Sequence, residues 1–238
     1  MIDTDVQAWD VYPHHRKWCN KLWLSEKLGY KCGPGGVKVL LAEDYVVRPI
    51  INLQGMGVGA ETIYLDPYDK RDKVPPGHFW CQKFKGRHFS CDFEWEEEWD
   101  GPLRTPRYTK GWRQLNCWEG IKETGDERLW RWSKWVKRNR FIKLPEWFDE
   151  LKDVKNINVE CIDDNIIEVH LRTGMDHRDK YKELIVYWKD SGYYKKTYSN
   201  HGYEWIESYE DAEGLLSTPR LGFLALPIIP RTRNQNEP

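Results

Sequence analysis

Two glutamates in residues 156–172 have the spacing of a metal site. The turn-forming residues 163–165 separate two runs rich in β-branched side chains, a pattern that predicts a β-hairpin. In the register that the pattern favours, Glu160 lies directly opposite Glu168. Like charges at such positions have Cβ atoms about 5 Å apart and destabilise the sheet, so we expect a cation between them. Carboxylates offer hard oxygen ligands, which makes Mg²⁺ the natural candidate.

The polarity of the two hairpin faces supports this register. A three-residue loop pairs Ile162 with Ile166 near the turn and separates polar from apolar residues. The polar face carries Asn158, Glu160, Glu168, His170 and Arg172, and the apolar face carries Val159, Cys161, Ile167, Val169 and Leu171. A shift of one residue would mix the two faces. The alternative is an edge hairpin without a ligand, whose polar face is solvated and whose Arg172 neutralises Glu168.

The composition limits the class of protein. A chain of 238 residues can bury one core or two small lobes, and a net charge of −1 gives no global basic field for nucleic acid or membranes. No apolar run is long enough to span a membrane, and residues 1–15 lack a secretion signal, so we expect a cytoplasmic protein. The six cysteines have no CxxC spacing, which favours reduced thiols over a zinc site. The 14 tryptophans could stack on sugars or bases, but core packing is favoured.

The elements that must position the hairpin are short helices and strands. We expect helices over 14–28, 126–140 and 145–151, strands over 45–48 and 61–65, and a hairpin of 79–84 with 88–95. The sequence predicts a loop over residues 96–125, a short strand or helix over 203–216, and a disordered tail over 228–238. This order indicates an α+β fold with mainly antiparallel strands.

A glycine-rich loop over residues 55–60 lies between the two expected strands. It matches GxGxxA, but a strand follows it where a dinucleotide site needs a helix, which argues against a Rossmann fold. No GKS or GKT follows either, which excludes a Walker loop. The remaining interpretation is a flexible flap whose backbone N–H groups cover a phosphate. Arg48 lies at the end of the preceding strand. The alternative is a glycine-rich turn without a ligand.

Taken in order, these pieces resemble the ATP-grasp superfamily over residues 13–177, most closely short ATP-grasp-like proteins encoded by bacteriophages. The segments that carry the resemblance are Asn20-Lys21-Leu22 with Leu28-Gly29-Tyr30, Val46-Val47-Arg48-Pro49, the flap, residues 80–92, Asn158-Val-Glu160 and Glu168-Val-His170-Leu-Arg172. The resemblance implies two small lobes, 13–95 and 96–227, with a nucleotide cleft between them and without the family's usual N-terminal domain. For a phage protein, the host cytoplasm or the virion would be the location.

The resemblance also implies roles for individual residues around ATP. Lys21 and Arg48 would contact the α- and β-phosphates, and backbone atoms from Gln82 to Phe84 would hold adenine. His88 stands where the family has an acid that binds the ribose. The flap that would close over the β- and γ-phosphates comprises Gln54, Gly55, Gly57 and Gly59.

The implied reaction takes place at the metal. Glu160 and Glu168 would bind Mg²⁺, and His170, in the family's Asn position, favours Mn²⁺ because imidazole is a softer ligand. Arg172 would steady the transferred phosphoryl group or the acyl phosphate. A carboxylate-bearing small molecule or peptide would attack the γ-phosphate, and an amine or thiol would displace phosphate, without a catalytic Ser, Cys or His.

Two other hypotheses remain open. The replacements at His88 and His170 and the missing N-terminal domain favour a non-catalytic protein that binds nucleotide, a virion component or a host protein. A protein partner could also complete the acceptor site. A single-stranded nucleic-acid binder could use the aromatic and basic residues 130–138, but the net charge gives it no support.

Overall fold

The computed structural model describes residues 2–54, 57–97, 111–123, 128–129, 131–174, 180–191, 201–210 and 218–228. These residues form two antiparallel sheets with a few short helices, which confirms the α+β class. The helices are α1 (Asp5–Val11), η1 (Pro13–Cys19), α2 (Lys21–Lys27) and η2 (Glu146–Leu151). The strands are β1 (Cys32–Pro34), β2 (Glu43–Pro49), β3 (Glu61–Leu65), β4 (His78–Gln82), β5 (His88–Glu96), β6 (Gly111–Ile121), β7 (Lys134–Lys137), β8 (Asn156–Ile162), β9 (Asn165–His170), β10 (Tyr181–Trp188), β11 (Glu204–Glu210) and β12 (Arg220–Pro227).

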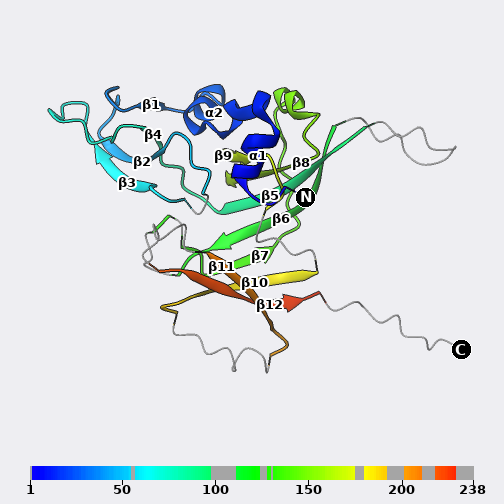
Figure 1. The fold of residues 1–238 in the computed structure, drawn as a ribbon. Coiled ribbons are helices and arrows are strands. Elements are labelled where there is room, and N and C mark those ends of the chain that lie inside the picture. The colour runs from blue at the N-terminus through cyan, green and yellow to red at the C-terminus, as the bar shows by residue number, and fades with distance from the viewer. Residues whose placement is uncertain are drawn as a thin grey trace, which may run out of the picture.

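The two sheets differ in size and in position. The smaller has the strand order β1-β4-β2-β3, and the larger has the order β11-β12-β10-β7-β6-β5-β8-β9. Figure 1 shows the smaller sheet at the upper left and strands β10 to β12 of the larger sheet at the bottom. The helices lie beside β8 and β9, where α2 contacts β9. None of the helices in the described ranges is long and apolar enough to cross a membrane.

Strand β5 has one apolar face and one polar face. Successive side chains of a strand point to opposite faces, and the apolar set is Phe89, Cys91 and Phe93, each at most 1% exposed. The opposite face carries His88, Ser90 and Asp92, as the alternation in the sequence predicts. Both faces of this strand are therefore buried, one in the core and one around a cavity.

Three apolar clusters hold the described chain together. The largest packs the helices against the apolar face of β5, β8 and β9, with Trp18, Phe148 and Leu151 almost fully buried. The second surrounds Trp118, Trp135, Trp188 and Phe223 on β6, β7, β10 and β12. The third lies under the smaller sheet around Tyr45 and Trp80. The buried tryptophans confirm that packing is their main role at these positions.

The expected helix over 14–28 is two helices. Asn20 ends η1 and caps α2, because its side-chain oxygen accepts a hydrogen bond from Trp23 N at 2.9 Å. Helix α1 was not predicted, although Thr4 and Gln7 form a capping box around its first turn. The sequence therefore placed the helical region correctly and missed its division and its first member.

The aromatic segment after residue 130 is not helical. The predicted helix over 126–140 is wrong, since residues 134–137 form β7, which pairs with β6 on one side and β10 on the other. Residues 96–125 were predicted as a loop, but residues 111–121 form the long strand β6. Pairing between distant strands decides these segments, and it overrides the helical spacing of Trp132 and Trp135.

The predicted hairpin of 79–84 with 88–95 is also wrong. Strand β4 pairs with β1 and β2 in the smaller sheet, whereas β5 pairs with β6 and β8 in the larger one. Residues 83–87 therefore connect the sheets, and β5, which the predicted lobe 13–95 includes, belongs to the larger sheet. Residues 204–210 form a strand, one of the two alternatives expected for 203–216. Of the tail predicted over 228–238, all but residue 228 lies outside the described residues.

Candidate functional site

Strands β8 and β9 form the hairpin that the sequence predicts, with Glu160 opposite Glu168. The turn is shorter than expected, because Ile162 pairs with Asn165 and Cys161 with Ile166. The predicted pairing of Ile162 with Ile166 is therefore wrong. An irregularity between Glu160 and Cys161 compensates for the missing loop residue and restores the pairing of the two glutamates.

The same irregularity exchanges the faces of the hairpin on which Ile166 and Ile167 lie. Ile166 is 3% exposed and lies in the core, and Ile167 lines the cavity, the reverse of the predicted faces. The tight turn is possible because Asp163 adopts φ 50°, a left-handed conformation that Asp tolerates better than most residues. The polar face of the hairpin thus keeps its charged residues and gains Ile167.

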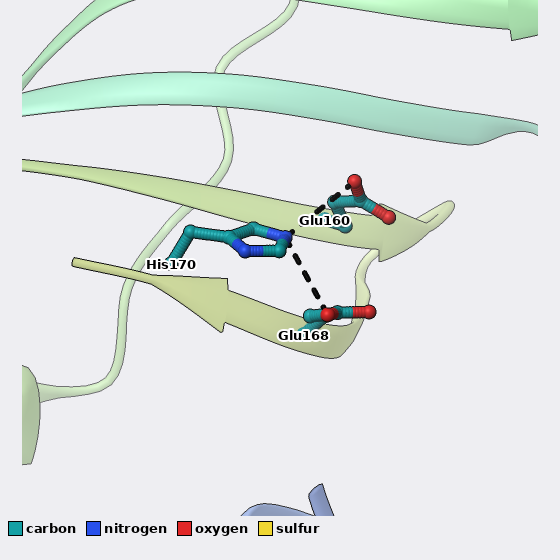
Figure 2. Close-up of side chains that lie close together, drawn as sticks. All are labelled: Glu160, Glu168 and His170. Carbon is teal, nitrogen blue, oxygen red and sulfur yellow. Dashed lines mark ion pairs between the residues drawn. The ribbon is translucent and has the colours of Figure 1, made fainter. Parts of the chain in front are cut away.

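Glu160, Glu168 and His170 gather at one point on this face. Their ligand atoms all lie within 4.8 Å of one another. His170 Nε2 is 3.7 Å from Glu160 Oε1 and 3.6 Å from Glu168 Oε1, and Figure 2 shows the imidazole edge turned toward both carboxylates. The predicted metal ligands therefore meet, and metal binding by them stays a prediction.

Lys21 and His88 flank the two glutamates. Lys21 Nζ is 2.6 Å from Glu168 Oε1, and His88 Nε2 is 3.3 Å from Glu160 Oε2. Lys21 is 6% exposed and comes from α2, which packs beside β9. The predicted role of Lys21 is a phosphate contact, but in this structure it pairs with Glu168 below the cavity surface. The positive charge expected between the glutamates is thus supplied in part by the chain.

Asp5 is a member of the site that the sequence did not reveal. Its carboxylate oxygens are both 3.0 Å from His170 Nδ1, and Oδ2 accepts a hydrogen bond from Arg172 Nη2 at 2.7 Å. All three side chains are at most 8% exposed. The capping box of Thr4 and Gln7 is the one local signal that could have located Asp5 at a helix start. Nothing local links it to residues 170–172.

The charges of this group determine its protonation. Burial alone would raise the pKa of Asp5, but His170 and Arg172 hold it well below its usual range. Burial alone would lower the pKa of His170, but the Asp5 and Glu168 carboxylates raise it to about 10. His170 and His88 likewise keep the pKa of Glu160 well below its usual range against the effect of burial. Without a metal ion, these contacts favour the charged forms of Asp5, Glu160 and His170.

A cavity of about 960 Å³ opens over this network, between the two sheets. Its size is within the range of sites for drug-sized ligands and cofactors. One part, the metal end, is lined by Arg48, Glu160, Glu168, His170 and Arg172. A second part, the hinge end, is lined by Val46, Cys81, Gln82, Phe84, Ile162 and Ile167. A third part, the aromatic end, is lined by Trp132, Trp135 and Trp188.

Most, but not all, of the residues predicted to contact the nucleotide line the cavity. Arg48, Gln54, Gly57, Gln82, Phe84 and His88 line the cavity. Gly59 does not line it; a Cβ there would come within 3.0 Å of Pro49 Cγ. Gly57 and Gly59 have φ 61° and 76°, which explains the glycines of the flap without a ligand. Gly55 lies outside the described residues.

Arg48 links the smaller sheet to the hairpin. Its Nη2 donates a hydrogen bond to the carbonyl of Ile167 at 2.8 Å, and its guanidinium lies 5.4 Å from the centre of the Phe79 ring. A cation from β2 is therefore held at the edge of the metal end. An anionic ligand in the cavity would meet Arg48 from the smaller sheet and Arg172 from the larger one.

A buried polar network lies beneath the metal end. Asn158 Nδ2 donates to Asp92 Oδ1 at 2.8 Å and to Ser90 Oγ at 3.0 Å, and Asn116 Nδ2 donates to Asp92 Oδ2 at 3.0 Å. The backbone N–H of Gly174 also donates to Asp92 Oδ1, at 2.7 Å. These bonds tie β5, β6 and β8 to the chain after β9 and fix the strands that carry the charged residues.

Comparison with known proteins gives structural similarity only. No protein-family model matches the sequence, and no curated protein matches it. A crystal structure from Archaeoglobus fulgidus, described as an ATP-grasp superfamily protein, aligns with a TM-score of 0.45 and 12% identity over 88% of this chain and 64% of that one. An L-amino acid ligase from Bacillus licheniformis aligns with a TM-score of 0.40 and 13% identity over 67% of this chain and 41% of that one.

These two similarities are weak and incomplete. Both TM-scores are below 0.5, and the chain spans less than two thirds of each protein that it resembles. The activity of those proteins is therefore not transferred to this chain.

Proposed function

We propose that the chain is an ATP-dependent ligase, which joins a carboxylate to an amine or a thiol through an acyl phosphate. The observation that carries the proposal is the meeting of Glu160, Glu168 and His170 at the wall of a cavity that two arginines also line. Carboxylates that hold a divalent cation beside phosphate-binding cations are the parts that phosphoryl transfer requires.

The shape of the cavity supports a nucleotide. The hinge end offers apolar side chains from both sheets, which suit a purine, and Gln82, Lys83 and Phe84 also line the cavity. The metal end begins next to it, since Ile162 and Glu160 are two residues apart on β8. A nucleotide that spans both ends would place its base between the sheets and its phosphates near Arg48.

The charged groups of the metal end support phosphoryl transfer. Glu160, Glu168 and His170 would hold a divalent cation, which neutralises charge on the phosphates when bound. Arg48 and Arg172 approach from opposite sheets and would hold the phosphoryl oxygens. This arrangement performs the reaction by positioning and charge neutralisation, so no protein nucleophile is needed.

The aromatic end supports a second substrate site. Trp132 lies 4.4 Å from His88 and 5.2 Å from Trp135 between ring centres, and Trp188 Nε1 donates to the carbonyl of Trp132 at 2.8 Å. These contacts make an apolar wall beyond the proposed ribose position. In the proposed reaction, the carboxylate-bearing substrate lies against this wall, with its carboxylate toward the metal end.

Nucleotide binding is the first step to test. Thermal unfolding of the full chain should shift upward with Mg·ATP or Mn·ATP, because a ligand that binds the folded state stabilises it. Glu168→Gln should reduce the shift, and Glu146→Gln, on an exposed residue outside the cavity lining, should not. An unchanged unfolding temperature up to millimolar nucleotide would contradict the proposal.

A nucleotide-binding protein without turnover is the second candidate. It is favoured because both arginines already bond to groups of this chain: Arg48 donates to the carbonyl of Ile167, and Arg172 donates to Asp5. Hydroxylamine separates the two candidates, because it converts an acyl phosphate to a hydroxamate and phosphate. With ATP, a divalent cation and a panel of amino acids and dicarboxylic acids, a ligase yields hydroxamate and ADP. Nucleotide binding without hydroxamate for any carboxylate would favour the second candidate.

A further inference from the structure

Asp5 contacts the one nitrogen ligand of the metal end from the side away from the glutamates. We propose that Asp5 orients His170 as a metal ligand, and that the site of Glu160, Glu168 and His170 thereby selects Mn²⁺ over Mg²⁺. This inference rests on the proposed function for the presence of a divalent cation, and it assigns a positioning residue and a metal preference to that site.

The two ring nitrogens of His170 have different partners. Nδ1 is 3.0 Å from both oxygens of Asp5, whereas Nε2 faces Glu160 and Glu168. A neutral imidazole that donates Nδ1–H to a carboxylate keeps its Nε2 lone pair for a metal, and the carboxylate fixes both the tautomer and the ring orientation. Asp5 is therefore placed where metal-binding histidines commonly have their supporting acceptor.

The distances from His170 to the two glutamates fit a shared ion. Two ligand atoms that are each about 2.1 Å from one ion lie between about 3 and 4.2 Å apart. His170 Nε2 is 3.7 Å from the nearer Glu160 oxygen and 3.6 Å from the nearer Glu168 oxygen. Lys21 Nζ lies 2.6 Å from the same Oε1 of Glu168, and a carboxylate oxygen has two lone pairs, so the ion would share this oxygen with the ammonium group.

Asp5 is held in this position by more than the imidazole. Its carboxylate accepts from Arg172 Nη2 at 2.7 Å, and α1 is anchored by the capping box and by Ala8, which is 1% exposed in the core. A carboxylate that is 6% exposed needs such partners, because an unpaired buried charge is strongly unfavourable. Arg172 balances the charge of Asp5, so the glutamates remain available to a divalent cation.

The nitrogen donor sets the metal preference. Mg²⁺ favours oxygen ligands in an octahedral arrangement and retains water, and it binds imidazole poorly. Mn²⁺ accepts carboxylate and imidazole together and ranks low among first-row ions in overall affinity. A fixed imidazole among two carboxylates therefore favours Mn²⁺ over Mg²⁺.

The test measures Mn²⁺ binding to the full chain without nucleotide. The electron paramagnetic resonance signal of free Mn²⁺ reports binding, and Mg²⁺ competition gives the ratio of the two affinities. We expect Mn²⁺ to bind at least tenfold more tightly than Mg²⁺. Asp5→Asn should weaken Mn²⁺ binding by about tenfold or more and leave Mg²⁺ binding nearly unchanged, the range seen when such supporting groups are lost.

Two further variants complete the design. His170→Asn should bring the ratio of affinities close to one, because the site then offers only oxygen donors at these positions. Asp10→Asn is the matched control, since Asp10 lies on the same helix and is exposed, and it should bind like the wild type. Nitrogen hyperfine coupling to bound Mn²⁺ should be present in the wild type and absent in His170→Asn, a readout that does not need Asp5→Asn to fold.

The outcomes separate this inference from the proposed function. Equal affinity of the wild type for Mn²⁺ and Mg²⁺, or a folded Asp5→Asn variant with unchanged Mn²⁺ affinity, overturns the inference even if ATP binds. Absence of nitrogen coupling overturns it as well. Selective Mn²⁺ binding without any stabilisation by nucleotide would support the metal site and contradict the ligase.

Discussion

The metal end and the aromatic end are walls of one cavity, but they are held together by different forces. At the metal end, buried charged and polar side chains satisfy one another: Asp5 with Arg172, Lys21 with Glu168, and Asp92 with Asn158. At the aromatic end, Trp132, Trp135 and Trp188 fit together by shape. Removing one polar partner leaves another without its hydrogen bond or counter-charge, whereas aromatic rings can adjust. The metal end should therefore be the more sensitive to single substitutions.

The largest expected effect is at Asp92. Asp92→Ala removes the acceptor for Asn158, Asn116 and the N–H of Gly174 at once. The expected loss is about 4 kcal/mol in the free energy of unfolding, because several buried donors lose their partner. Chemical denaturation measures it, and Glu94→Gln on the same strand, a partly exposed residue paired with Arg113, should cost less than about 1 kcal/mol. A similar loss in both variants would remove the distinction between the two ends.

Lys21 should show the next largest effect. Lys21→Met leaves Glu168 without its ammonium partner at a site where both side chains are mostly buried, and breaking such a pair costs about 3 kcal/mol. Added Mn²⁺ should restore more stability to Lys21→Met than to the wild type, because the ion replaces the lost charge. Lys17→Met, which breaks an exposed pair with Glu150, is the control. Equal rescue in all three proteins would argue against a cation site at Glu168.

A substitution at the aromatic end should have a smaller effect. A Cβ at Gly120 would lie 2.8 Å from Trp132 Cε3 and 3.0 Å from Trp135 Cζ3, so Gly120→Val overpacks this wall. The expected cost is about 2 kcal/mol, since the rings shift to accept the added atoms. Leu115→Val on the same strand, at a position 38% exposed, should change stability little. A loss greater than that of Asp92→Ala would show that shape outweighs charge in this cavity.

A change of pH tests the charges of the metal end in the metal-free protein without a substitution there. The pKa of His170 is raised in the folded protein to about 10, so its contribution to stability is complete below about pH 6.5 and is lost as the pH rises toward 10. Between pH 7 and 10, the unfolding temperature in a chelator should fall on the order of 10 °C more in the wild type than in His170→Gln. His14→Gln, an exposed histidine, should follow the wild type. Parallel curves for the wild type and His170→Gln would contradict this.

The parts of the site that the sequence predicted are those that depend on neighbours along the chain. Glu160 and Glu168 were placed opposite each other because the polarity of a hairpin follows its two strands. The polar face of β5 was predicted for the same reason, from the alternation of residues 88–95. These patterns belong to single elements, and no distant contact can change them without exposing apolar side chains.

The parts that the sequence missed depend on distant pairing. The predicted hairpin of 79–84 with 88–95 would make Gly86 a turn glycine, but Gly86 lies in the connection between the two sheets, and a Cβ there would collide with the carboxylate of Asp163. Its role is to let the hairpin turn approach, which a local reading cannot distinguish from a tight turn. Trp132 and Trp135 have the spacing of a helix, but Trp135 lies on β7 and Trp132 lies just before it, because β6 and β10 pair with β7.

The contact between Asp5 and His170 joins residues 165 positions apart in the chain. During synthesis, helix α1 leaves the ribosome long before β9 does, so the complete metal end can form only after most of the described chain has been made. Closing so long a segment is slow compared with forming a helix or a hairpin. Helix α1 is held by Ala8 in the core, by its contact with η1 and by Asp5 at the metal end. A metal-binding signal would therefore report that the contact between α1 and β9 has formed, and hydrogen exchange in α1 would reveal the loss of this contact.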